Sequence, residues 1–286
     1  MANAAISHTR VIQHMPVEQR AEKQASSTGS MQVQRTVNDS FQRALRMMEE
    51  AGYGIGENVS VVVDPNLSFM GYTFPGEGGF NIVVSGAAVD SGMLEGLLVH
   101  EMSHIYRMKS KHPSHDAEII NAAIGRLMNR GYDRDYQQKI LHDIVNSLED
   151  LYADDVAFKV FGKARIFPVE TAGRFFLSWL TPEPEVSGNA GRDGWVNAAL
   201  MLRNSFALSN MARHGVPDNG NRAAELNRRF LSQLPAGGTE AFEYFHRVMM
   251  ELKEDVTASE FGRLLNEYLS RFVEEAERPT SRISKS

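Results

Sequence analysis

Apolar residues recur at helical spacing along most of the chain and at strand spacing only in one short region. Three runs rich in β-branched or aromatic residues, separated by turn residues, predict strands at 59–63, 67–73 and 80–84. Apolar positions three and four apart predict helices elsewhere, at 38–51, 90–108, 135–159, 169–180, 195–212, 220–234, 238–253 and 257–276, and Asp116 and Glu118 open a further helix between the second and third of these. We therefore expect an α+β fold, mainly α-helical, with a small three-stranded antiparallel sheet packed on the helix at 90–108 and a helical C-terminal half.

The two ends of the chain lack this pattern. Gln, Ser, Ala and scattered charges dominate residues 1–34, which offer too little apolar surface to offset the entropy of ordering. We expect a disordered or loosely attached tail there, with Asn38 or Asp39 capping the first helix. Residues 279–286 are expected to be a frayed tail.

Composition narrows the class of protein. The chain of 286 residues is 42% hydrophobic and 23% charged, as is usual for soluble globular proteins. A formal net charge of −6 gives no electrostatic footprint for nucleic acid. No apolar run reaches the ~18 residues of a transmembrane helix, and no secretory signal is recognisable. Cysteine is absent, which excludes a thiolate metal site and fits a cytoplasmic location.

The strongest chemical motif lies in the expected helix at 90–108. His100 and His104 are four residues apart, so both imidazoles project from one helical face. This spacing suits two nitrogens that hold one tetrahedral cation at ~2.0–2.1 Å. Glu101 follows the first histidine, where its carboxylate can accept a proton from a metal-bound water.

This H-E-x-x-H pattern resembles the active-site helix of the zincins, a group of zinc metallopeptidases. The resemblance implies one Zn²⁺ ion and a peptide or protein substrate, with Glu101 as the general base. It also implies that the strand at 80–84, just before the helix, is an edge strand with which substrate backbone can pair.

A third ligand is expected from the helix at 135–159. Four polar residues share one face of it: Asp143, Asn146, Asp150 and Asp154. Like charges four residues apart, as at Asp150 and Asp154, favour a nearby cation. The segment Asp150-Leu-Tyr-Ala-Asp154 resembles the E-x-x-A-D of a gluzincin family, with Asp where that family has Glu. The resemblance implies Asp150 as the metal ligand and Asp154 as a support for a ligating histidine. The neighbouring carboxylate of Glu149 is the alternative ligand, although only Ala153 lies four residues beyond it.

Other histidines fit less well. The metzincin pattern requires Gly and His where this chain has Arg107 and Ser110, so His112 and His115 are expected on a loop rim rather than as ligands. Four downstream residues could steady an oxyanion, and sequence does not choose among them: Arg213, His214, Tyr244 and His246.

The sequence thus predicts a zincin-like metal-binding catalytic domain at 35–165 and a helical region at 166–278 packed on it. The segments Val99–His115 and Asn146–Phe158 also resemble an uncharacterised archaeal family of predicted metallopeptidases. The expected function is zinc-dependent peptide hydrolysis. The competing hypothesis is a non-catalytic, metal-stabilised scaffold or partner-binding protein, and hydrolysis of a non-peptide amide is also open. Oligomeric state and substrate specificity are not predicted.

Overall fold

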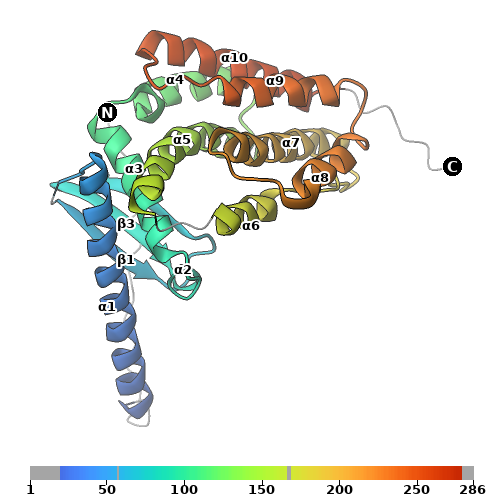
Figure 1. Cartoon of the computed structure of the whole chain (residues 1–286). Coiled ribbons are helices and arrows are strands. Elements are labelled where there is room, and N and C mark those ends of the chain that lie inside the picture. Colours follow the sequence, from blue (N-terminus) through green and yellow to red (C-terminus); the bar gives the residue numbers. More distant parts are fainter. Residues whose placement is uncertain (1–19, 57, 166–168, 279–286) are drawn as a thin grey trace.

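The protein has an α+β fold that is mainly helical, as the sequence predicts (Figure 1). The structure, a computed structural model, describes residues 20–56, 58–165 and 169–278. The strands are β1 (Val59–Asp64), β2 (Gly71–Gly76) and β3 (Gly79–Ser85). The helices are α1 (Arg20–Ala51), α2 (Gly86–Val89), α3 (Leu94–Lys109), α4 (Ala117–Met128), α5 (Asp135–Ala164), α6 (Val169–Trp179), α7 (Ala190–Arg213), α8 (Arg222–Leu231), α9 (Gly238–Met250) and α10 (Ala258–Ala276), with short 3-10 turns η2 (Pro113–His115) and η3 (Asn219–Asn221).

The sheet is mixed, so the expectation of a purely antiparallel sheet is wrong in this detail. The strand order is β1-β3-β2, with β3 parallel to β1 and antiparallel to β2. A tight hairpin joins β2 to β3, and Gly78 at its tip has a φ of 79°, which favours glycine. After β1 the chain leaves the neighbouring position empty and forms β2 one place further along the sheet. The hairpin then returns the chain, and β3 fills the position between β1 and β2. The strand expected at an edge is therefore central, and β1 and β2 are the two edge strands.

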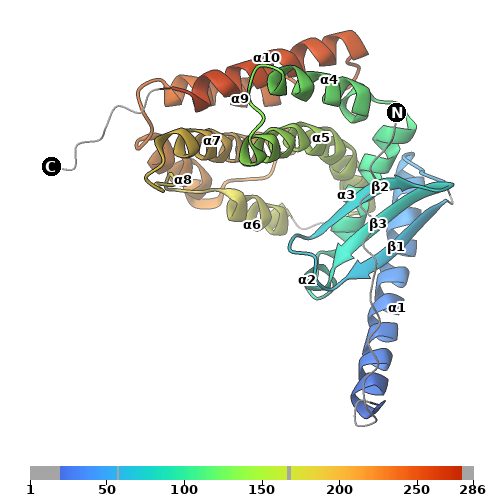
Figure 2. The ribbon, with the colours of Figure 1, turned by 180° about the vertical axis from the view of Figure 1, so that it is seen from behind.

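Helices cover one face of the sheet, and the other face is open (Figure 2). Ile82 and Val84 of β3 face α1 and α3 and are fully buried with Leu98 and Met102. On the opposite face Tyr72 and other large apolar side chains are exposed. This packing fixes α3 against the sheet by its apolar side.

The 30-residue helix α5 joins two hydrophobic cores. Its C-terminal half packs with α1, α3 and the sheet, through Val156 and Val160. Its N-terminal half packs with α4, α7, α9 and α10, through Leu141 and Leu148. The cores therefore cross the boundary expected at residue 165, and α5 fixes the position of the metal-binding helix relative to the helical half.

The first helix starts earlier than the sequence predicts. The α1 helix begins at Arg20, not at a cap on Asn38 or Asp39, so residues 20–34 are helical rather than a tail. Val37 is fully buried, and the Gln34 side chain donates a hydrogen bond to the Val61 carbonyl at 3.1 Å. The expectations for residues 1–19 and 279–286 fall outside the described residues.

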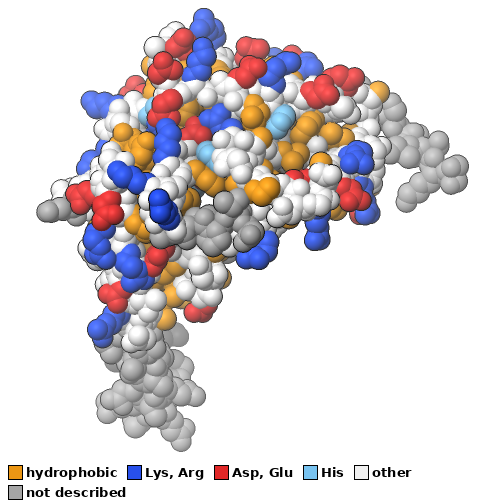
Figure 3. All heavy atoms as spheres, in the orientation of Figure 1, with side chains coloured by type: hydrophobic (Ala, Val, Ile, Leu, Met, Phe, Trp, Pro, Cys, Tyr) orange, Lys and Arg blue, Asp and Glu red, His pale blue; other side chains and the backbone are white. Residues whose placement is uncertain are grey.

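The surface is mixed in charge. Lys/Arg and Asp/Glu side chains are interspersed over the face shown in Figure 3. Within the part of the chain that the structure describes, every helix is too short or too polar to cross a membrane.

Candidate metal centre

The α3 helix presents both motif histidines to α5. Its apolar positions, including Leu98 and Met102, are buried on the side of the sheet and α1, which leaves the histidine face toward α5. The rings of His100 and His104 lie edge to face with centroids 4.7 Å apart, and their Nε2 atoms are separated by 3.1 Å. Two imidazole nitrogens at this separation repel each other unless a proton or a cation lies between them.

Asp150 of α5 meets these two nitrogens. Its Oδ1 lies 3.2 Å from His104 Nε2 and 3.8 Å from His100 Nε2. The donor atoms of a tetrahedral zinc site are about 3.3 Å apart, given bonds of ~2.0–2.1 Å. Among the described residues, His100, His104 and Asp150 form the one group of three or more such side chains close enough to hold a metal ion. The donor set thus fits zinc in chemistry and spacing.

Glu149, the alternative ligand, does not join this group. Burial, followed by the charge of Asp150, raises the pKa of its carboxyl to about 8. The structure therefore places Asp150 with the imidazoles, and its role as a metal ligand stays a prediction.

Asp154, one turn beyond Asp150, supports His100. Its Oδ1 accepts a hydrogen bond of 2.8 Å from His100 Nδ1, so once the imidazole is neutral its lone pair lies on Nε2, where a cation can bind. The other oxygen, Oδ2, accepts from Asn210 Nδ2 of α7 at 2.7 Å. Asp154 thus has the position expected from the sequence, whereas nothing in the sequence singles out Asn210.

His104 is supported differently. Its Nδ1 lies 2.8 Å from Nε2 of His115, which belongs to the η2 turn. His112 and Ser114 of the same segment are buried behind this contact. The segment packs between α3, α5 and α10, so the expectation of a loop rim for His112 and His115 is wrong, although neither joins the group of donor atoms.

Glu101 is buried beside the start of the edge strand β2. A Cβ atom added to Gly71 would lie 3.6 Å from Glu101 Oε1, 3.3 Å from Leu97 and 2.9 Å from the Val83 carbonyl. Gly71 therefore allows β2 to approach the carboxylate closely. Burial raises the pKa of Glu101 to about 7, with the positive His100 opposing that shift. Such a pKa suits a group that accepts and returns a proton near neutral pH.

The remaining charges of the metal-free site depend on one another. Burial alone would lower the pKa of His100, but the neighbouring carboxylates, above all Asp154, raise it to about 10. Burial raises the pKa of Asp150 to about 7 against the pull of His100. Burial and the charge of His100 together lower the pKa of His104 to about 3. Near neutral pH the metal-free site therefore keeps His100 protonated and Asp150 partly protonated, where a cation would otherwise balance the carboxylates.

The cluster is partly exposed to solvent. The side chains of His100, His104 and Asp150 are 25%, 13% and 14% exposed. Three protein ligands with an accessible fourth position are typical of catalytic zinc sites, whereas structural sites are closed by a fourth protein ligand.

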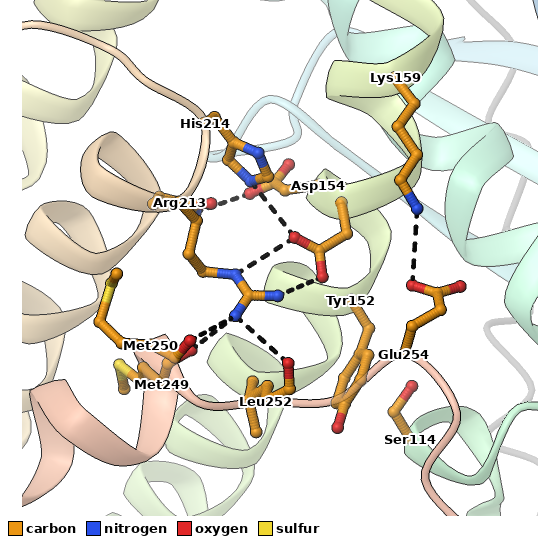
Figure 4. Close-up of polar contacts among 12 residues, drawn as sticks. Ser114, Tyr152, Asp154, Lys159, Arg213, His214, Met249, Met250, Leu252 and Glu254 are labelled. Carbon is orange, nitrogen blue, oxygen red and sulfur yellow. Dashed lines mark hydrogen bonds and ion pairs between the residues drawn. The ribbon is translucent and has the colours of Figure 1, made fainter.

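None of the four downstream candidates for oxyanion stabilisation is directed at this cluster. Arg213 pairs with Asp155. Arg213 also donates to the carbonyls of Met249 and Met250 at the end of α9 (Figure 4). His214 stacks on Phe158 with ring centroids 4.0 Å apart. These two residues clamp α7 to α5 behind the metal site.

Tyr244 and His246 of α9 are also engaged elsewhere. The Tyr244 hydroxyl contacts Glu267, and Ser209 Oγ lies 2.7 Å from His246 Nδ1. His246 lines a cavity of about 620 Å³ between α7, α8 and α9. That cavity is lined mainly by apolar side chains and lies apart from the histidine–aspartate cluster. We therefore place the candidate site at the cluster rather than in the larger cavity.

Comparison with known proteins identifies a family but no activity. No curated protein and no solved structure matches the chain. The match to a protein family covers residues 30–274, which include every residue of the candidate site. The chain therefore belongs to a family of unknown function, DUF5781.

Proposed function

We propose that this protein is a zinc-dependent metallopeptidase. The observation that carries the proposal is the convergence of His100, His104 and Asp150 on one solvent-accessible point next to the buried carboxylate of Glu101. Two imidazoles and one carboxylate are a donor set typical of catalytic zinc. The absence of cysteine fits a reducing compartment, and a cytoplasmic location is part of the proposal.

Each residue of the site has a separate task. When bound, zinc would supply a Lewis acid that lowers the pKa of a water molecule and polarises a carbonyl group. Glu101 accepts the proton of the attacking water and then returns it to the leaving amine, which its pKa of about 7 permits. Asp154 holds His100 with Nε2 toward the cation. Asp150 contributes the negative charge that keeps a divalent ion in the site.

The edge strand β2 favours a peptide over other amides as substrate. Ser85 N–H donates to Met70 C=O at 2.9 Å, and bonded and non-bonded pairs alternate along an antiparallel ladder. Gly71 and Thr73 therefore direct their backbone groups to the free edge, where no strand of the described chain pairs with them. An extended peptide that pairs with this edge would pass beside Glu101.

The test is Glu101→Gln, with peptide hydrolysis and zinc content measured on the same preparations. A library of peptides of mixed sequence, analysed by mass spectrometry with zinc and with a chelator, serves as the substrate. We expect Glu101→Gln to bind one zinc ion and to lose about 10²–10⁴-fold in hydrolysis, because the proton acceptor is removed.

Glu95→Gln is the matched control, since Glu95 lies on the same helix and pairs with Arg43 on the surface. It should retain both zinc and activity. Full hydrolysis by Glu101→Gln would exclude its role as the base. A zinc-loaded wild-type protein that cleaves no peptide would favour the scaffold alternative.

A further inference from the structure

A continuous chain of hydrogen bonds lies behind His104. His104 Nδ1 contacts His115 Nε2 at 2.8 Å, and His115 Nδ1 contacts Ser114 Oγ at 2.8 Å. Ser114 Oγ also contacts His112 Nδ1 at 2.8 Å, and His112 Nε2 lies 3.0 Å from the Glu254 carbonyl oxygen. The chain thus leads from a proposed metal ligand on α3 to the loop between α9 and α10.

The carbonyl at the far end fixes the direction of every bond. A carbonyl oxygen only accepts, so His112 Nε2 must carry a hydrogen, and the neutral ring then accepts at Nδ1. The backbone N–H of Ser114 also points at that Nδ1, at 3.3 Å, which agrees with an acceptor there. Ser114 consequently donates to His112 and accepts from His115 Nδ1.

The same logic continues to the metal site. A neutral His115 with its hydrogen on Nδ1 must accept at Nε2, so His104 donates from Nδ1. The lone pair of His104 then lies on Nε2, the atom 3.2 Å from Asp150 Oδ1. Each donor in the chain meets one acceptor, and no other arrangement of neutral rings satisfies all four contacts.

We propose that His115, Ser114 and His112 are positioning residues that hold His104 in the tautomer able to bind zinc, with the Glu254 carbonyl as their anchor. The inference rests on the proposed metal site. It assigns the two motif histidines different supports. A carboxylate holds His100, whereas a row of neutral groups holds His104 and adds no charge to the site.

The backbone around this chain is built to hold it in place. Lys111 has a φ of 54°, in the left-handed region that favours glycine, and this turn reverses the chain so that η2 packs back on α3. At the other end, the Glu254 carboxylate binds the buried guanidinium of Arg107 on α3 at 2.5 and 2.9 Å. Figure 4 shows Glu254 near Ser114 and Tyr152, paired with Lys159 of α5. The helical half thus orients a residue of the metal site.

The direct test is the tautomeric state in the zinc-loaded wild-type protein, read from two-bond ¹H–¹⁵N correlations of the imidazoles. We expect hydrogen on Nδ1 of His104 and His115 and on Nε2 of His112, with zinc on His104 Nε2. Hydrogen on His115 Nε2, or on His112 Nδ1, would overturn the assignment without any variant.

A second test uses zinc affinity, measured by competition with a chromophoric chelator. His115→Leu removes the acceptor and should weaken zinc binding about 10–100-fold, as is usual when the support of a ligating histidine is lost. His115→Gln can place an amide oxygen near the former Nε2 and should recover most of that loss. His142→Leu, which removes an exposed imidazole of α5, is the matched control and should have no effect.

Equal zinc affinity of His115→Leu and wild type would refute the positioning role of the hydrogen-bond chain while leaving the metal site intact. A wild-type protein that binds no zinc would instead refute the metal site, and with it the positioning role of the hydrogen-bond chain. Peptide hydrolysis by Glu101→Gln tests the proposed base and does not bear on either zinc measurement, so a failure of the hydrogen-bond chain is distinguishable from a failure of the proposed function.

Discussion

Zinc binding should depend steeply on pH, because the metal must displace protons from its own ligands. In the metal-free protein the pKa of His100 is raised to about 10 by Asp154 and the other carboxylates, against the effect of burial. The pKa of Asp150 is raised to about 7 by burial. Both groups must lose their protons before they can bind a cation.

The size of the effect follows from these pKa values. At pH 7, which is three units below the pKa of His100, removing the His100 proton costs about 4 kcal/mol at ~1.36 kcal/mol per unit. This proton alone makes the apparent Kd for zinc fall about tenfold for each pH unit between pH 6 and 8. Asp150 is about nine-tenths protonated at pH 6 and one-tenth at pH 8, which adds roughly another tenfold. The affinity should therefore rise roughly 10³-fold from pH 6 to pH 8, with one to two protons released per zinc at pH 7.

The assay is a chelator competition at pH 6, 7 and 8, combined with calorimetry in buffers of different ionisation enthalpy. Asp154→Asn removes the main charge that raises the pKa of His100, so its curve should flatten toward pH 8. An amide can still accept from His100 Nδ1, and the unpartnered Oδ1 of Asn210 can accept from the new amide if Asn210 flips. Asp143→Asn, at an exposed site of α5, should behave like wild type. A wild-type affinity that is equal at pH 6 and pH 8 would refute this account of the site.

Three further results are expected. Asp150→Ala should weaken zinc binding about 10²–10³-fold, if roughly 10–16 kcal/mol is shared among four ligands, whereas Glu149→Ala should retain zinc; the reverse order in a chelator competition would reassign the ligand. Gly71→Val should reduce peptide hydrolysis with zinc retained, since its Cβ would lie 2.9 Å from the Val83 carbonyl; unchanged turnover would remove β2 from the substrate site. Glu254→Ala should lower the free energy of unfolding by about 1–3 kcal/mol in urea titrations, because the buried Arg107 loses its ion pair, while the neighbouring Asp255→Ala should not.

The parts of the site that lie within a single helix can be predicted from local spacing in the sequence. Helical periodicity places His100 and His104 on one face, and the acidic face of the next long helix indicates Asp150 and Asp154. The 3.6-residue repeat is enough to put each pair on one face, because each pair lies within one helix, whereas the choice of Asp150 as the ligand comes from the resemblance to the gluzincin motif. The separation of 46 residues between the motif and Asp150 matters little once both helices pack on a common apolar seam.

The features that the sequence does not predict depend on how separate segments meet. The insertion of β3 between β1 and β2 is a matter of pairing order, which short-range alternation does not contain. The contact of His115 with His104 requires a reversal at Lys111, a residue type that gives no signal for a left-handed turn. Asn210 and the Glu254 carbonyl reach the site from the helical half, and no motif marks either one.

The central claim is tested most directly by a crystal structure of the zinc-loaded protein with anomalous diffraction at the zinc edge. We predict one anomalous peak about 2.0–2.2 Å from His100 Nε2, His104 Nε2 and one Asp150 oxygen, with a solvent oxygen in the fourth position beside Glu101. A peak elsewhere, or a zinc ion closed by a fourth protein ligand at this point, would contradict the assignment of a catalytic site.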